Sequence, residues 1–142
     1  MVKQISIFVS NEKGGMSRIT KILADNKIDI RALSIADTAD YGVLRLIVDR
    51  PDDALFCLKQ QGVTASLTDV LAVSVPDVPG GLYSIMQALT DGGIDIDYIY
   101  AFLHPKKDQA CVIIRAEEDK KAVEALASHG VSVIESGDIY SI

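Results

Sequence analysis

Branched apolar residues recur at every second position in two short segments of the chain. Every second side chain is apolar over residues 5–9 and again over residues 71–75. A period of two is typical of a strand that buries only one of its faces. Both segments are therefore predicted to be strands that each contribute one face to a core.

The pattern changes after each of these strands. Apolar residues recur at spacings of three and four over residues 16–23 and 82–89, which places them on one side of a helix. The helices are predicted to end near Asn26-Lys27 and Gly92-Gly93, because Asn and Gly readily adopt the left-handed conformation that closes a helix. An apolar stripe of this kind has to pack on a sheet.

The two segments belong to an internal repeat. Gly14-Gly15 and Gly80-Gly81 lie 66 residues apart, and the same spacing relates the Ile-Asp-Ile tripeptides that begin at Ile28 and Ile94. After small insertions the match resumes, with Gly62 over Gly130. The chain is therefore predicted to be a duplication of one unit.

The rest of each copy completes the same order of elements. Residues 43–49 and 110–116 are rich in β-branched side chains and are predicted third strands, residues 51–61 and 117–129 are predicted helices, and residues 63–67 and 131–135 are predicted fourth strands. The order β-α-β-β-α-β predicts an α+β protein of two ferredoxin-like βαββαβ units in tandem, with antiparallel sheets and the helices on one face. The predicted domains are residues 1–69 and 70–142.

Composition narrows the function classes. The chain has 14 Lys and Arg against 20 Asp and Glu, a net charge of −6, which disfavours nucleic acid and anionic membranes as partners. Neither a secretory leader nor a membrane span is expected, and the protein is predicted to be cytoplasmic. Cys57 and Cys111 both lie in apolar segments, so they are interpreted as reduced core thiols, with no disulfide and no metal site.

The turn from the first strand into the first helix of each copy carries the most chemical information. Two consecutive glycines leave backbone N–H groups uncovered at the positive end of a helix, an arrangement that suits a carboxylate. Asn11 and Asp77, three residues before the first glycine, can add a side-chain contact to a ligand. Alternatively they only cap the turn, and the glycines only supply its tight geometry.

This turn, with the helix and the Ile-Asp-Ile strand that follow it, resembles the signature of the ACT family. Residues 77–96 match it closely, including Pro79 before the first glycine, whereas residues 11–30 have Lys13 at that position. The resemblance implies amino-acid sites between paired ACT units, formed by this loop of one unit and the second strand of its partner. Carried over to this sequence, the implied ligand-binding residues are Asn11, Gly14, Gly15, Met16, Ile30, Asp77, Gly80, Gly81, Leu82 and Ile96.

Other candidate chemistry is weaker. The chain has no Walker loop, dinucleotide fingerprint or nucleophile elbow, and no catalytic residues or cofactor are predicted. His104 and His129 lack the spacing of metal ligands and are interpreted as solvated or structural. Tyr83, Tyr98 and Tyr100 could line a pocket, although packing is the more common role of such residues.

These features predict a regulatory protein or sensor that binds a free amino acid and is not an enzyme. The alternative is a regulatory subunit or repressor accessory that acts by protein contacts, because residues 14–30 also resemble the start of acetolactate synthase small subunits. A homodimer is expected, and a metabolic enzyme or a regulator is a possible further partner.

Overall fold

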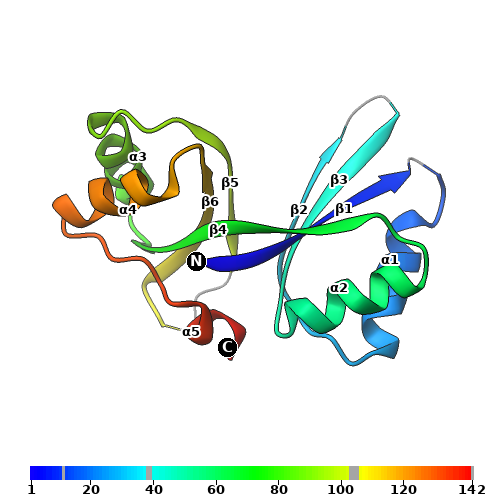
Figure 1. Cartoon of the computed structure of the whole chain (residues 1–142). Helices are drawn as coiled ribbons and strands as arrows, with labels where there is room; N and C mark the ends of the chain where they lie inside the picture. Colours follow the sequence, from blue (N-terminus) through cyan, green and yellow to red (C-terminus); the bar gives the residue numbers. More distant parts are fainter. Residues whose placement is uncertain (11, 38–39, 103–105, 142) are drawn as a thin grey trace. The chain divides into compact units, whose positions relative to one another are not determined.

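The computed structural model describes residues 1–10, 12–37, 40–102 and 106–141. The chain separates into two compact units, one made mainly of residues 3–68 and the other mainly of residues 69–140 (Figure 1). Hydrogen-bonded neighbours follow the strand order β2-β3-β1-β4-β6-β5. The α+β class and the two successive βαββαβ copies predicted from the sequence are confirmed.

The first unit is built around an antiparallel sheet with two helices. Its elements are β1 (Val2–Ser10), α1 (Gly15–Asp25), β2 (Ile30–Asp37), β3 (Tyr41–Val48) and α2 (Pro51–Gln60), followed by the first part of β4 (Ala65–Pro76). β3 pairs with both β1 and β2. α1 and α2 contact each other and lie on the same side of the sheet (Figure 1).

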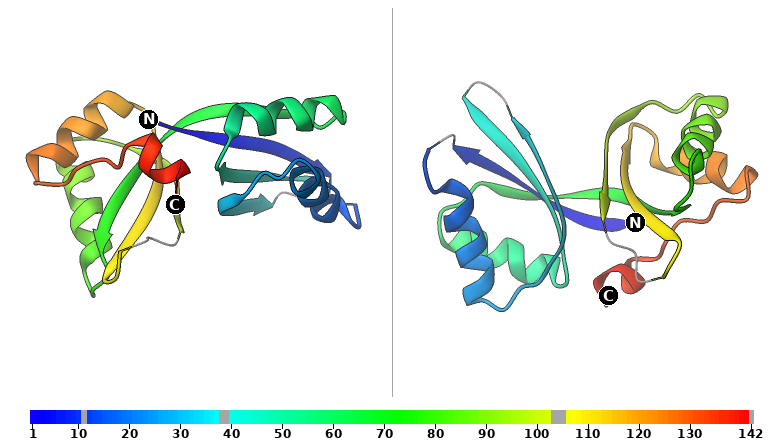
Figure 2. Two further views of the ribbon diagram at one scale, coloured as in Figure 1. Left: turned by 90° about the horizontal axis from the view of Figure 1, so that it is seen from below. Right: turned by 180° about the vertical axis from the view of Figure 1, so that it is seen from behind.

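The second unit repeats this plan. After the second part of β4 come α3 (Gly81–Asp91), β5 (Ile96–Phe102), β6 (Gln109–Ala116), α4 (Asp119–Ser128) and the short helix α5 (Ser136–Tyr140). β6 pairs antiparallel with both β4 and β5. α3 and α4 contact each other, whereas α5 is set apart from them (Figure 2).

Two details differ from the sequence prediction. The last strand of the first copy and the first strand of the second copy form one continuous strand, β4, so the boundary after residue 69 stays a prediction. The predicted fourth strand over residues 131–135 is wrong as a full strand, because only Val133 forms a bridge, to Val73. Ile134 N donates to the Ala72 carbonyl at 2.7 Å, and the chain then turns into α5, where Ile139 is fully buried.

Each copy has its own apolar core between its helices and its sheet. The alternating residues of β1 and of the second part of β4 face the apolar stripes of α1 and α3, as the two periodicities predict. The central buried side chains of the two cores are Ile5, Ile7, Leu23, Leu44, Leu46 and Leu58 in the first copy, and Leu71, Val73, Ile85, Leu89, Ile114 and Leu126 in the second.

Glycines determine the turn from each first strand into the helix that follows. Gly14 and Gly80 precede the helices with φ of 87° and 84°, a left-handed conformation that favours glycine. The next glycine is required for a different reason. A Cβ on Gly81 would lie 2.2 Å from the Pro76 carbonyl oxygen, and a Cβ on Gly15 would lie 3.2 Å from the Ser10 carbonyl oxygen.

Replacing Gly81 by Ala is expected to lower the free energy of unfolding by about 1–3 kcal/mol, because the strand and the helix must move apart to admit the methyl group. Gly137→Ala is the matched control, since a Cβ at that position meets no atom within 4 Å. Urea denaturation of both variants measures the difference. Equal stability of the two variants would contradict the close approach at Gly81.

Cys111 lies fully buried on β6. Burial raises the pKa of its thiol to about 12, because the thiolate would lose its hydration, and a backbone hydrogen bond at Val73 offsets this only in part. Cys57 on α2 is only partly buried. Both cysteines are free thiols, as the sequence predicts.

The folded protein is therefore expected to react with iodoacetamide at Cys57 well before Cys111, since the neutral, inaccessible thiol is a poor nucleophile below about pH 12. Peptide mapping by mass spectrometry measures the two rates, with the protein in denaturant as the control. Similar rates in the folded protein would show that Cys111 is reached by solvent.

Candidate functional site

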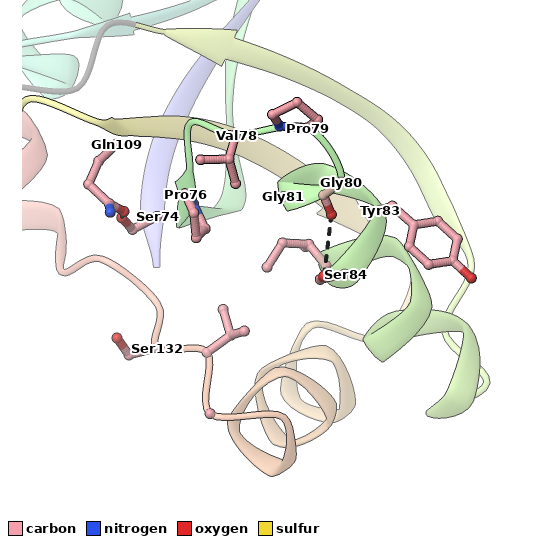
Figure 3. Close-up of a pocket in the computed structure, with 13 residues that line it drawn as sticks. Ser74, Pro76, Val78, Pro79, Gly80, Gly81, Tyr83, Ser84, Gln109 and Ser132 are labelled. Carbon is pink, nitrogen blue, oxygen red and sulfur yellow. Dashed lines mark hydrogen bonds between the residues drawn. The ribbon is translucent and has the colours of Figure 1, made fainter.

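A pocket of about 660 Å³ lies where β4 turns into α3 (Figure 3). One wall is the turn that contains Pro79, Gly80 and Gly81, and the opposite wall is the segment that follows α4. Its lining residues are Ser74, Pro76, Val78, Pro79, Gly80, Gly81, Tyr83, Ser84, Ile85, Gln109, Gly130, Val131 and Ser132. This volume falls within the range of about 300–1,000 Å³ that is usual for small-molecule sites.

The first copy has a smaller pocket of about 290 Å³ at the corresponding turn. Its lining residues are Phe8, Val9, Ser10, Glu12, Lys13, Gly14, Gly15, Arg18, Ile19, Gly62, Val63 and Thr64. With the exception of Val9, the repeat places each of these residues over a residue that lines the larger pocket. The duplication has therefore conserved the position of a cavity as well as the fold.

The first turn of each helix has donors without helical partners. Gly15 N and Gly81 N are engaged within the turn by the carbonyls of Glu12 and Val78, at 3.3 and 3.0 Å. The next two amides of each helix, before Arg18 and before Ser84, have no carbonyl partner within the helix. Neither α1 nor α3 has a side-chain cap that could bond to them. The first turn of α3 can thus donate hydrogen bonds to a carboxylate and favours its charge.

The predicted site residues divide into those that line a pocket and those that do not. Gly14 and Gly15 line the first pocket, and Gly80 and Gly81 line the second. Met16 packs against the first core, and Leu82 is exposed outside the pocket lining. Asn11 lies outside the described residues.

Asp77 does not act as a helix cap. Its backbone N–H donates to the Asp108 carbonyl at 3.0 Å, while Gly80 occupies the cap position of α3 and no side chain caps that helix. Asp77 is exposed and is not among the residues that line the pocket. The interpretation of Asp77 as a cap is therefore wrong, and its contact with a ligand stays a prediction.

Ile30 and Ile96 begin the second strand of their copies. Both are partly buried and pack against the core of their own copy, and neither lines the pocket of that copy. The contribution of these strands to a ligand therefore stays a prediction.

Several pocket residues were not predicted from the sequence. Ser74 Oγ donates to Gln109 Oε1 at 2.9 Å, and Gly130, Val131 and Ser132 close the far side. No role is predicted for Gln109 from the sequence. The repeat of Gly62-Val63 as Gly130-Val131 was the signal that could have identified the far wall.

The remaining candidates have structural surroundings. His129 is the C-cap of α4, and its Nε2 lies 3.4 Å from Asp91 Oδ2 at the surface. Tyr83 lines the larger pocket, as the sequence analysis allows, although its hydroxyl donates to Gln87 Oε1 and its ring points away from Ser74 and Ser132 (Figure 3). Tyr98 and Tyr100 do not line either pocket.

Metal-binding clusters and membrane-spanning helices are both absent from the part of the chain that the structure describes. Within those residues no cluster of three or more His, Cys, Asp or Glu side chains could hold a metal ion. None of the helices there is long and apolar enough to cross a membrane. His104 lies outside the described residues.

Comparison with known proteins places the chain in a family. A comparison with curated protein sequences found no match. Among solved structures, a Bacteroides thetaiotaomicron protein is 37% identical, with a TM-score of 0.92 over 99% of this chain and 96% of that one. The regulatory subunit of aspartate kinase from Thermus thermophilus has the same fold at 22% identity, with a TM-score of 0.65 over 89% of this chain and 91% of that one.

The corresponding subunit from Thermus flavus is 21% identical, with a TM-score of 0.62 over 90% of this chain and 92% of that one. The family model for the ACT domain pair matches residues 1–142. This match covers both copies of the repeat and both glycine turns. The chain therefore belongs to the family of ACT domain pairs.

Proposed function

We propose that this protein is a regulatory sensor that binds a free amino acid at a glycine turn and does not catalyse a reaction. The observation that carries the proposal is the pair of pockets at corresponding positions of the two copies, each walled by a Gly-Gly turn. Membership of the ACT domain pair family supports the same role. No nucleophile, base and orienting group come together in either set of lining residues.

The chemistry of the larger pocket suits a zwitterion. The first-turn amides of α3 offer hydrogen bonds to the carboxylate. Neutral oxygens, such as the hydroxyls of Ser74 and Ser132, offer acceptors for the ammonium group. Asp77, on the same turn, can add a complementary charge if its side chain reaches the ligand.

Binding is expected to raise the melting temperature of the whole chain. A ligand that binds only the folded state stabilises it by about 2.7 kcal/mol at about one hundred times Kd. A thermal-shift screen of the twenty amino acids measures this effect, with N-acetylated and amidated forms of each active amino acid as controls that remove its charges. A screen in which no amino acid shifts the transition would contradict the proposal.

A second candidate function is that of a regulatory subunit that acts through another protein. The similarity in fold to the regulatory subunit of aspartate kinase extends over nine-tenths of both chains and favours this role. In this role the chain would pair with a second copy of itself and would bind a larger enzyme of amino-acid metabolism. The two roles are compatible, because the ligand would then alter the contact with the enzyme.

Affinity purification of the tagged chain from its native cells is expected to retain both an untagged copy of the chain and a larger catalytic chain. Sedimentation of the purified chain alone is expected to give a dimer at micromolar concentration. A monomer that retains no partner would contradict this assembly without affecting the ligand proposal.

A further inference from the structure

The two pockets differ at the positions where the repeat would make them equal. Phe8 and Arg18 have the largest side chains in the lining of the first pocket, and their counterparts in the second copy are Ser74 and Ser84. A serine leaves free the space that a phenyl ring or a guanidinium group occupies. Both differences make the first pocket the smaller one, in agreement with its volume of about 290 Å³ against about 660 Å³ for the second.

The rims of the pockets also differ, with large aromatic residues in the first copy and smaller polar residues in the second. In the first copy the rings of Phe8 and Tyr41 meet edge to face, with centroids 5.5 Å apart. Tyr41 pairs with Ser10 in the sheet, and Gln109 pairs with Pro76 at the corresponding place in the second copy. An aromatic pair in one copy is thus replaced in the other by the hydrogen-bonded pair of Ser74 and Gln109.

Two hydrogen bonds also cross the first pocket. Arg18 Nη2 donates to the Gln61 carbonyl and so ties α1 to the turn after α2. Phe8 N donates to the Thr64 carbonyl at 3.1 Å, which holds the following segment against β1. In the second copy, Ser84 Oγ instead bonds back to the Gly80 carbonyl at 3.3 Å within its own helix (Figure 3).

The charges of the two linings differ as well. Glu12, Lys13 and Arg18 line the first pocket, whereas none of the described residues that line the second pocket has a charged side chain. An ionised ligand side chain placed in the second pocket would lose hydration without gaining a charged partner. An uncharged side chain meets hydroxyl, amide and apolar groups there, including Val78 and Val131.

From these differences we propose that the two copies have specialised, so that the second pocket alone binds the ligand, an amino acid with an uncharged side chain. This inference rests on the proposed function, which it makes specific in stoichiometry, site and ligand class. The first pocket keeps the same turn, but Phe8 and Arg18 narrow it and two hydrogen bonds cross it.

Calorimetric titration of the whole chain with glycine, serine, threonine, valine and leucine is expected to show at least one ligand that binds once per chain. Aspartate and lysine are expected to bind at least about tenfold more weakly. Ser84→Leu and Ser74→Phe, which add bulk to the second pocket, are each expected to weaken binding by about tenfold or more.

Ser66→Phe is the matched control, because Ser66 is exposed on the same strand and lines neither pocket. Ser84 is exposed on α3, so Ser84→Leu provides a test even if Ser74→Phe does not fold, and thermal melts identify any variant that fails to fold. Arg18→Ser is expected to leave the affinity of the second pocket unchanged.

The outcomes separate this inference from the function on which it rests. Unchanged affinity in a folded Ser84→Leu variant, two sites per chain, or equally tight binding of aspartate or lysine would overturn the specialisation while leaving amino-acid binding in place. If no amino acid bound the wild-type chain, the proposed function itself would fall and this inference with it.

Discussion

In each copy of this protein, the packing of the first helix on the sheet depends on its close approach to the strand before it. At Gly81 the backbone passes so near the Pro76 carbonyl that no side chain fits between them, and Gly80 turns the chain in a left-handed conformation just before. This turn sets where α3 begins, and therefore which residues of α3 meet the sheet. It also leaves the first amides of the helix beside a cavity.

The core depends on the same turn. Ile85 and Leu89 reach the buried face of β4 only if the helix starts in the correct rotation over the sheet. In the first copy, Ile19 and Leu23 are placed in the same way after Gly14 and Gly15. Packing and site geometry are therefore linked, and a change at the turn affects both.

Both copies keep this glycine turn and the core below it, while the side chains around the turn differ. Ser74 stands where the first copy has Phe8, and Ser84 where it has Arg18, yet the cores on the opposite side keep the same pattern of Ile, Leu and Val. Side chains at a surface cavity can vary more freely because they do not carry the packing of the fold. Two copies of one fold can in this way hold cavities of different size and charge.

The sequence by itself determined the repeat, the type and order of most elements, and the glycine turns. These features follow from local rules, since periods of two and of three to four residues define strands and helices, and glycine marks a turn that other residues cannot form. The same rules failed at residues 131–135, where a β-branched segment forms only one bridge before the chain enters α5.

Only the tertiary structure decided which residues surround the turn. Gln109 reaches Ser74 because β6 pairs with β4, and Gly130 lies opposite Gly80 because α4 packs beside α3. It also decided that Asp77 does not cap α3. Such contacts join residues far apart in the chain, and no local pattern of hydrophobic and polar positions encodes them.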